Sequence, residues 1–233
     1  MTALAWVTFA LALVLALVRI PSALRGENRL MMALFGLIAL AVLLSIGGPY
    51  LAIDAALGGI NLANLLLRFL IYAITLLLAV RVARAFSARS AQSALLGPWG
   101  LGALALVGAG TVMSFLLMGL LPSSVGLGAG DNHAWFDVYG ELGRVYPGFT
   151  GVILLPSLLR ALRGASLPAL RVAAGLLAAG YAMLALTVIF PLMPDDWVAA
   201  RQAMNYSSLL FLLTGLATIW LAGLMARRRA ETS

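Results

Sequence analysis

The chain alternates long apolar runs with short polar stretches. A helix of about 20 residues crosses the hydrocarbon core of a bilayer, which is about 30 Å thick. The runs are apolar throughout and lack the period-two alternation that marks the strands of a membrane barrel. This pattern predicts seven transmembrane helices, at about residues 3–18, 30–50, 60–80, 98–121, 139–159, 172–193 and 203–225.

Composition agrees with this pattern. Hydrophobic residues make up 63% of the chain and charged residues 10%, with a mean hydropathy of +1.05. A water-soluble protein of this size needs more polar surface than that. We therefore predict an all-α membrane protein with one transmembrane domain over residues 1–233 and no soluble domain. Residues 226–233 are expected to form a short basic cytoplasmic tail.

The charges predict how the chain is oriented. All 15 basic residues are arginines, and most flank the apolar runs, as the positive-inside rule requires of cytoplasmic segments. Placing these arginines in the cytoplasm puts the N-terminus outside and the C-terminus inside, which needs an odd number of spans. The net charge of +7 thus reflects topology in a bacterial cell membrane, and no nucleic-acid partner is expected. The clusters lie at residues 19–29, 81–89, 160–171 and 227–229.

Residue types that are missing or rare exclude several kinds of chemistry. The chain has no cysteine, which excludes Fe–S clusters and haem thiolates. It has no lysine, which excludes a retinal Schiff base, and its single histidine cannot supply a bis-histidine haem site. No nucleophile and base pair is recognisable, so no cofactor is expected and enzymatic activity is the least favoured class.

A candidate internal repeat relates the two halves of the chain. A shift of 142 residues aligns the second and third runs with the sixth and seventh, in the same sense. Two parallel three-helix units joined by a fourth helix would give a 3+1+3 arrangement, as in some sugar transporters. The competing explanation is that any helix entering from the cytoplasm tends to start with Arg and to end near Pro and Asp. The aligned pairs are Arg29 with Arg171, Pro49 with Pro191, Asp54 with Asp196 and Phe69 with Phe211.

The third run carries a polar stripe around a charged residue. Asn61, Asn64, Arg68, Tyr72 and Thr75 follow one another at helical spacing, so they share one face of the helix. A charged side chain in the middle of a membrane helix costs about 2.5 to 3.5 kcal/mol on insertion scales. We therefore expect the stripe to face the interior of the bundle.

Arg68 then needs a partner or a function. Asp54, Glu141 and Asp196 are the acidic residues expected near its depth. Two roles stay open: the stripe fixes helix packing while Arg68 snorkels, or it lines a path for a substrate or an ion. Under the second role, the candidate substrate-binding residues are Arg68, Asn61, Asn64, Tyr72 and Asp54.

The single histidine belongs to another polar group. If residues 131–144 are helical, His133, Asp137 and Glu141 share one face and form the one metal candidate of the chain. Their spacing matches no established zinc motif, and Arg144 on the same face competes for the carboxylates. A solvated surface of paired charges is the favoured explanation, so no metal is expected.

Two segments carry a family resemblance. In Gly47–Tyr72, a proline ends one helix, a polar residue follows, and a glycine and asparagine turn opens the next; the later segment Leu170–Leu186 has arginine at its start and Gly-Tyr within the helix. The matching residues of the first segment are Pro49, Asp54, Gly59 and Asn61. Both segments resemble a family of uncharacterised actinobacterial seven-helix integral membrane proteins that are described as transporters. The resemblance implies the same seven-helix architecture; many members carry a soluble region after the seventh helix, which we do not expect here.

Two functions follow from these features. The first is a small-solute transporter or permease, with a site between helices near Arg68 for an anionic or zwitterionic solute. The second is a non-transporting membrane subunit that acts as a sensor or assembly partner in a larger complex. The expected partners are the lipid bilayer and either other membrane subunits or further copies of this chain.

Overall fold

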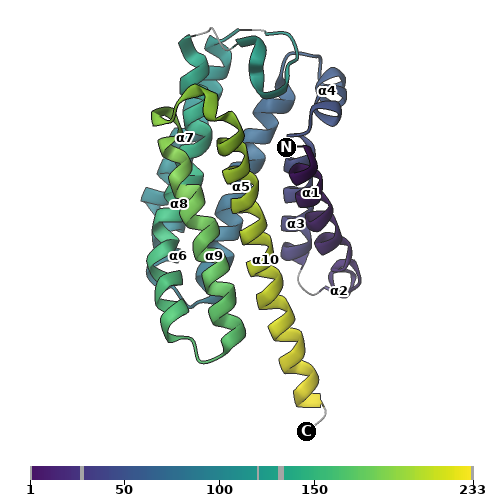
Figure 1. Cartoon of the computed structure of the whole chain (residues 1–233), viewed down its shortest axis with the longest axis vertical. Coiled ribbons are helices and arrows are strands. Elements are labelled where there is room, and N and C mark those ends of the chain that lie inside the picture. The colour runs from purple at the N-terminus through teal and green to yellow at the C-terminus, as the bar shows by residue number, and fades with distance from the viewer. Residues whose placement is uncertain (1, 27–28, 120, 131–133, 232–233) are drawn as a thin grey trace.

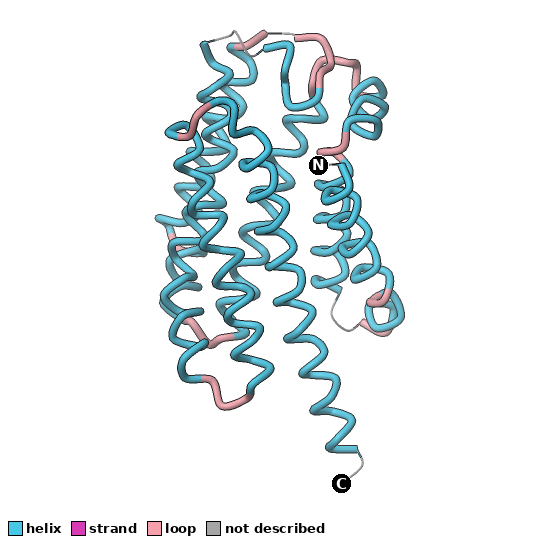
Figure 2. The backbone as a smooth tube through the Cα atoms, viewed as in Figure 1, coloured by secondary structure: helices cyan, strands magenta, loops and turns pink. Residues whose placement is uncertain are grey.

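Every element of the described chain is helical. The computed structural model describes residues 2–26, 29–119, 121–130 and 134–231, and these ranges contain no strand. Most long helices run along the long axis of one bundle, with loops at its two ends (Figures 1 and 2). The α-helices are α1 (Thr2–Leu17), α2 (Ile20–Leu24), α3 (Arg29–Leu43), α4 (Gly47–Ala56), α5 (Leu62–Ala85), α6 (Arg89–Leu96), α7 (Pro98–Leu117), α8 (Ala134–Gly164), α9 (Pro168–Leu186) and α10 (Val198–Glu231). Short 3-10 helices are η1 (Val125–Gly130), η2 (Thr187–Leu192) and η3 (Asp195–Trp197).

Six segments of the described chain are long and apolar enough to cross a membrane, or up to seven if the bent pair α3 and α4 counts as one span. Large apolar side chains such as Leu106 and Val152 are exposed on the outside of the bundle. Such side chains are stable on a lipid-facing surface and costly in water. These features are compatible with a multi-pass membrane protein in contact with the bilayer.

The second apolar run is not one straight helix over residues 30–50, and that expectation was wrong. Helix α3 ends at Leu43 and α4 begins at Gly47, with an angle of 97° between them. Ile46 between them is extended. Pro49 has no N–H to donate to the carbonyl of Ser45, and its ring would clash with that carbonyl in a continuous helix. Two glycines immediately before it further weaken the helix.

The runs at 139–159 and 203–225 lie within longer helices, and the remaining helices begin or end a few residues away from the predicted runs. Helix α8 has 31 residues and α10 has 34, against predicted runs at 139–159 and 203–225. Hydropathy marks the apolar part of a helix, whereas backbone hydrogen bonds continue into polar residues at either end. Pro147 and Pro156 lie inside α8 without ending it.

Close packing fixes the second half of the bundle, where α9 lies against both α8 and α10. A Cβ atom at Gly180 would lie 2.8 Å from Cγ of Leu212, and one at Gly215 would lie 2.7 Å from Cγ of Leu177. The missing side chains thus let α9 and α10 approach, as small residues do between membrane helices. In the first half, α1 packs on α3, and α5 contacts both α3 and α8.

Candidate functional site

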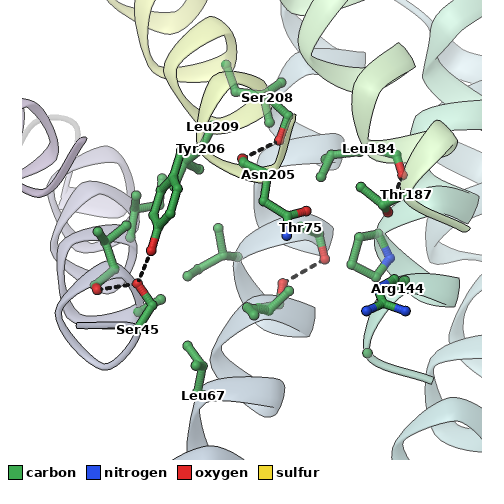
Figure 3. A pocket seen from close by; sticks show the side chains of 18 of the residues that line it. Ser45, Leu67, Thr75, Arg144, Leu184, Thr187, Asn205, Tyr206, Ser208 and Leu209 are labelled. Atoms are coloured by element: carbon green, nitrogen blue, oxygen red, sulfur yellow. Dashed lines mark hydrogen bonds between the residues drawn. The ribbon is translucent and has the colours of Figure 1, made fainter. Parts of the chain in front are cut away.

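A cavity of about 500 Å³ lies where the two halves of the bundle face each other. Its walls come chiefly from α3 and α5 on one side and from α8, α9 and α10 on the other (Figure 3). This volume is in the range of small-molecule sites in proteins. Most of the wall is apolar, and no acidic residue of the described chain lines it. The polar lining residues are Ser45, Arg68, Thr75, Arg144, Thr187, Gln202, Asn205, Tyr206 and Ser208.

Arg68 reaches this cavity from the polar stripe of α5. The stripe faces the interior, as expected: Asn61, Asn64, Tyr72 and Thr75 are all buried. The Arg68 guanidinium carbon lies 5.0 Å from the centre of the Tyr139 ring on α8, a cation–π contact. On the same helix, Gly143 lies so close that a Cβ atom there would overlap the guanidinium.

The acidic residues expected near Arg68 have other surroundings. Both oxygens of the buried Asp54 carboxylate accept backbone N–H bonds at the start of α5, from Asn61 at 2.9 Å and from Ala63 at 2.8 Å. Glu141 is ion-paired with Arg144, and Asp196 is exposed. Within the described ranges, no carboxylate oxygen lies within 4.0 Å of the Arg68 guanidinium. Arg68 therefore brings a positive charge without an ion-pair partner to the cavity wall.

A second arginine lines the same cavity. Arg144 of α8 is partly buried, is held by Glu141 one turn earlier, and places its guanidinium carbon 5.2 Å from the centre of the Phe190 ring. Its pairing with Glu141 was expected, but its place on the cavity wall was missed. The signal was present in the sequence, because Arg144 lies inside the predicted run 139–159, just as Arg68 lies inside the run 60–80.

Asn61 joins three segments at one end of the bundle. Its backbone is left-handed, with φ of 63°, a conformation that asparagine tolerates better than most residues. Its amide oxygen accepts bonds from the Tyr50 hydroxyl and the Ser124 N–H, both at 2.9 Å. Its amide nitrogen donates to the carbonyls of Leu121 at 3.0 Å and Pro122 at 2.8 Å. These bonds tie α4 and α5 to the segment that follows α7.

Two further members of the stripe also bond to neighbouring helices. The Tyr139 hydroxyl donates to the Asn64 side-chain oxygen at 2.8 Å. The Tyr72 and Thr111 hydroxyls lie 2.7 Å apart, and Thr111 also donates to the carbonyl of Val107, so Tyr72 is the donor between them. Of the five residues proposed from the sequence, only Arg68 lines the cavity. Packing and capping account for the contacts of the other four.

The remaining polar groups of the cavity differ in what they can donate. Thr75 and Thr187 donate their hydroxyl protons to carbonyls of their own helices. Ser45 does the same at the bend between α3 and α4, and its oxygen lies 3.0 Å from the Tyr206 hydroxyl of α10, a bond that joins the two walls (Figure 3). The side-chain amide of Asn205 forms no hydrogen bond within the described chain. The guanidinium groups and the amides of Asn205 and Gln202 are therefore donors that remain for a molecule in the cavity.

The metal candidate can be followed only in part. His133 lies outside the described residues. Asp137 is exposed, and Glu141 is committed to Arg144. Over the residues that the structure describes, no group of three His, Asp or Glu side chains could hold a metal ion.

Comparisons of this chain with protein-family models, curated proteins and solved structures find no match. The resemblance to actinobacterial transporter-like proteins therefore stays a prediction.

Proposed function

We propose that this protein is a small-solute transporter or permease whose solute binds in the central cavity beside Arg68. The observation that carries the proposal is a charged guanidinium without a carboxylate partner on the wall of a cavity of about 500 Å³. A charge inside a membrane bundle is costly and marks a functional site by default. Arginine matches the planar, bidentate geometry of carboxylates and related anions, which fits an anionic or zwitterionic solute.

The broken helix supports this proposal. Ile46 and Gly47, at the bend between α3 and α4, line the cavity. Irregular backbone at membrane depth is tolerated where protein or a water-filled cavity surrounds it, and secondary transporters build solute sites from such interrupted helices. We therefore count α3 and α4 as one broken span, which gives a seven-span bundle of the kind that the family resemblance implies.

The arrangement of the two walls also supports the 3+1+3 repeat. In this repeat, α3 with α4 corresponds to α9 with η2, and α5 corresponds to α10. In both units, a helix ends a few residues before the aligned proline. Helix α3 gives way to α4 before Pro49, and α9 passes into the 3-10 helix η2, which contains Pro191. The cavity lies between the two units, where repeat-built transporters bind their substrates.

The orientation has a direct test, since the chain has no native cysteine. We expect the C-terminal end of α8 in the cytoplasm and its N-terminal end outside. A membrane-impermeant maleimide added to intact cells should label Ala134→Cys and should label Ser166→Cys only after the cells are opened. Both positions are exposed, Ala134 at the start of α8 and Ser166 two residues after its end, so each controls for the other. The reverse pattern would contradict the proposed orientation.

Transport itself is tested in proteoliposomes. Uptake of anionic and zwitterionic solutes should exceed that of protein-free vesicles, and Arg68→Gln should reduce it by about 10- to 100-fold. This range corresponds to the loss of about 1.5 to 3 kcal/mol for a hydrogen bond to a charged group. Arg84→Gln is the matched control, because Arg84 is exposed on the same helix and does not line the cavity.

Uptake that is unchanged in Arg68→Gln would overturn the site. Absence of flux for all tested solutes, together with a fixed protein partner that co-purifies in mild detergent, would favour the non-transporting subunit instead.

A further inference from the structure

We infer that the solute is a monoanion with an uncharged, largely apolar body, such as a branched aliphatic monocarboxylate, and not a zwitterion. This inference rests on the proposed function and narrows its substrate class. It comes from the charges that line the cavity and from the chemistry of the remaining wall.

The balance of charge favours one negative group. Arg68 and Arg144 are the charged lining residues of the described cavity wall, and no carboxylate is among the lining residues. Glu141, outside the lining, pairs with Arg144 and neutralises it. Among Arg68, Arg144 and Glu141, one net positive charge remains. A single carboxylate would balance it, whereas a dianion would leave one negative charge uncompensated inside the bundle.

The side chain of Arg68 is placed to bind one carboxylate. Arg68 is held against α8 by the Tyr139 ring and lies against Gly143, the residue next to Arg144 in the chain. The two arginine side chains therefore enter the cavity from neighbouring positions on α5 and α8. Arginine can bind a carboxylate through two parallel hydrogen bonds, which fixes its orientation as well as its position.

The ammonium group of a zwitterion would find no ionic partner. An ammonium group carries three donors and one positive charge, and its removal from water is costly unless an anion compensates. The cavity wall offers only neutral acceptors, chiefly hydroxyl oxygens and the amides of Asn205 and Gln202. The nearby guanidinium groups would also repel it.

The body of the solute faces apolar side chains. Beyond the arginines, the wall of the cavity continues along α3 and α5 to α10. Burial of hydrocarbon against such a wall is favourable, whereas burial of unpaired polar groups is unfavourable. The apolar side chains that form it include Ile38, Val42, Leu67, Ile71, Ile74 and Leu212.

A matched set of probes tests this inference on the full chain in nanodiscs. We use 4-methylpentanoate, leucine, 3-methylbutylamine and 3-methylpentanedioate, which are a monoanion, a zwitterion, a cation and a dianion of similar size. Leucine is the sharpest comparison, because it is 4-methylpentanoate with one added ammonium group. Titration calorimetry should show saturable binding of 4-methylpentanoate at least about tenfold tighter than that of the other three probes. Arg68→Gln should weaken this binding at least about tenfold, and Arg84→Gln should leave it unchanged.

The outcomes separate the two proposals. Leucine binding as tight as 4-methylpentanoate, or no saturable binding of the monoanion, would overturn the inference. Saturable uptake of leucine in proteoliposomes would then still support transport. Selective binding of 4-methylpentanoate without any flux would uphold the inference about the ligand and overturn the transport function.

Discussion

Asp54→Ala is expected to destabilise the protein by about 2 to 6 kcal/mol, because each of two buried N–H groups left without an acceptor costs about 1 to 3 kcal/mol. The Asp54 carboxylate is fully buried and accepts bonds from the N–H groups of Asn61 and Ala63 at the start of α5. Its negative charge also lies at the positive end of the α5 dipole. The loss would loosen the helix that carries Arg68.

Thermal unfolding in detergent, followed by tryptophan fluorescence, measures this effect. Asp54→Asn keeps one side-chain acceptor and should unfold between the wild type and Asp54→Ala. Asp137→Ala removes an exposed carboxylate and should stay within about 0.5 kcal/mol of the wild type. Equal melting of Asp54→Ala and the wild type would show that the carboxylate does not hold the start of α5.

Asp54 also shows where sequence reasoning about the site reached its limit. Arg68 was expected to need an acidic partner, and Asp54 was one of the three candidates near its depth. In the structure the Asp54 carboxylate accepts bonds from backbone N–H groups instead. Gly58 and Gly59 adopt positive φ angles of 106° and 69°, and this turn brings the start of α5 back to the end of α4. Such a short-range return of the chain leaves no trace in hydropathy or charge patterns.

The fold shows a similar limit, because the apolar pattern locates the helices but hides local breaks within them. Apolar runs predicted the helices well, since burial in lipid forces backbone hydrogen bonds to close within each segment. The bend between α3 and α4 was missed because the residues around it remain apolar. The Gly47-Gly48-Pro49 sequence was the available signal, and its effect on helix continuity is local chemistry that an average over 20 residues hides.

The cavity depends on contacts between residues far apart in the chain. A charge inside an apolar run pointed to Arg68, and the helical spacing of its polar neighbours pointed to an interior face. The opposite wall, with Asn205 and Tyr206 of α10, could not be deduced, because the packing of α5 against α8 and of α9 against α10 depends on small side chains whose partners are not visible in one sequence.

The packing of Arg68 against Gly143 predicts a functional effect of a substitution on the neighbouring helix. Gly143→Ala should reduce solute uptake and the affinity for 4-methylpentanoate by at least about tenfold, because a Cβ atom at this position would overlap the Arg68 guanidinium. The ring of Tyr139 lies 5.0 Å from the guanidinium carbon, so the side chain must leave its place on the cavity wall to make room.

Gly140→Ala is the matched control for this substitution. Gly140 lies one turn earlier on α8, and a Cβ atom there would have no neighbouring atom within 4 Å, so uptake and melting should remain close to wild type. The double variant Gly143→Ala with Arg68→Gln tests whether Gly143→Ala acts through overlap with the Arg68 side chain or through a general effect on α8. Glutamine is shorter than arginine, so the double variant should melt at a higher temperature than Gly143→Ala alone but should not recover uptake. Wild-type uptake by Gly143→Ala would mean that the solute does not depend on Arg68 in this position, and the proposed binding site would then be wrong.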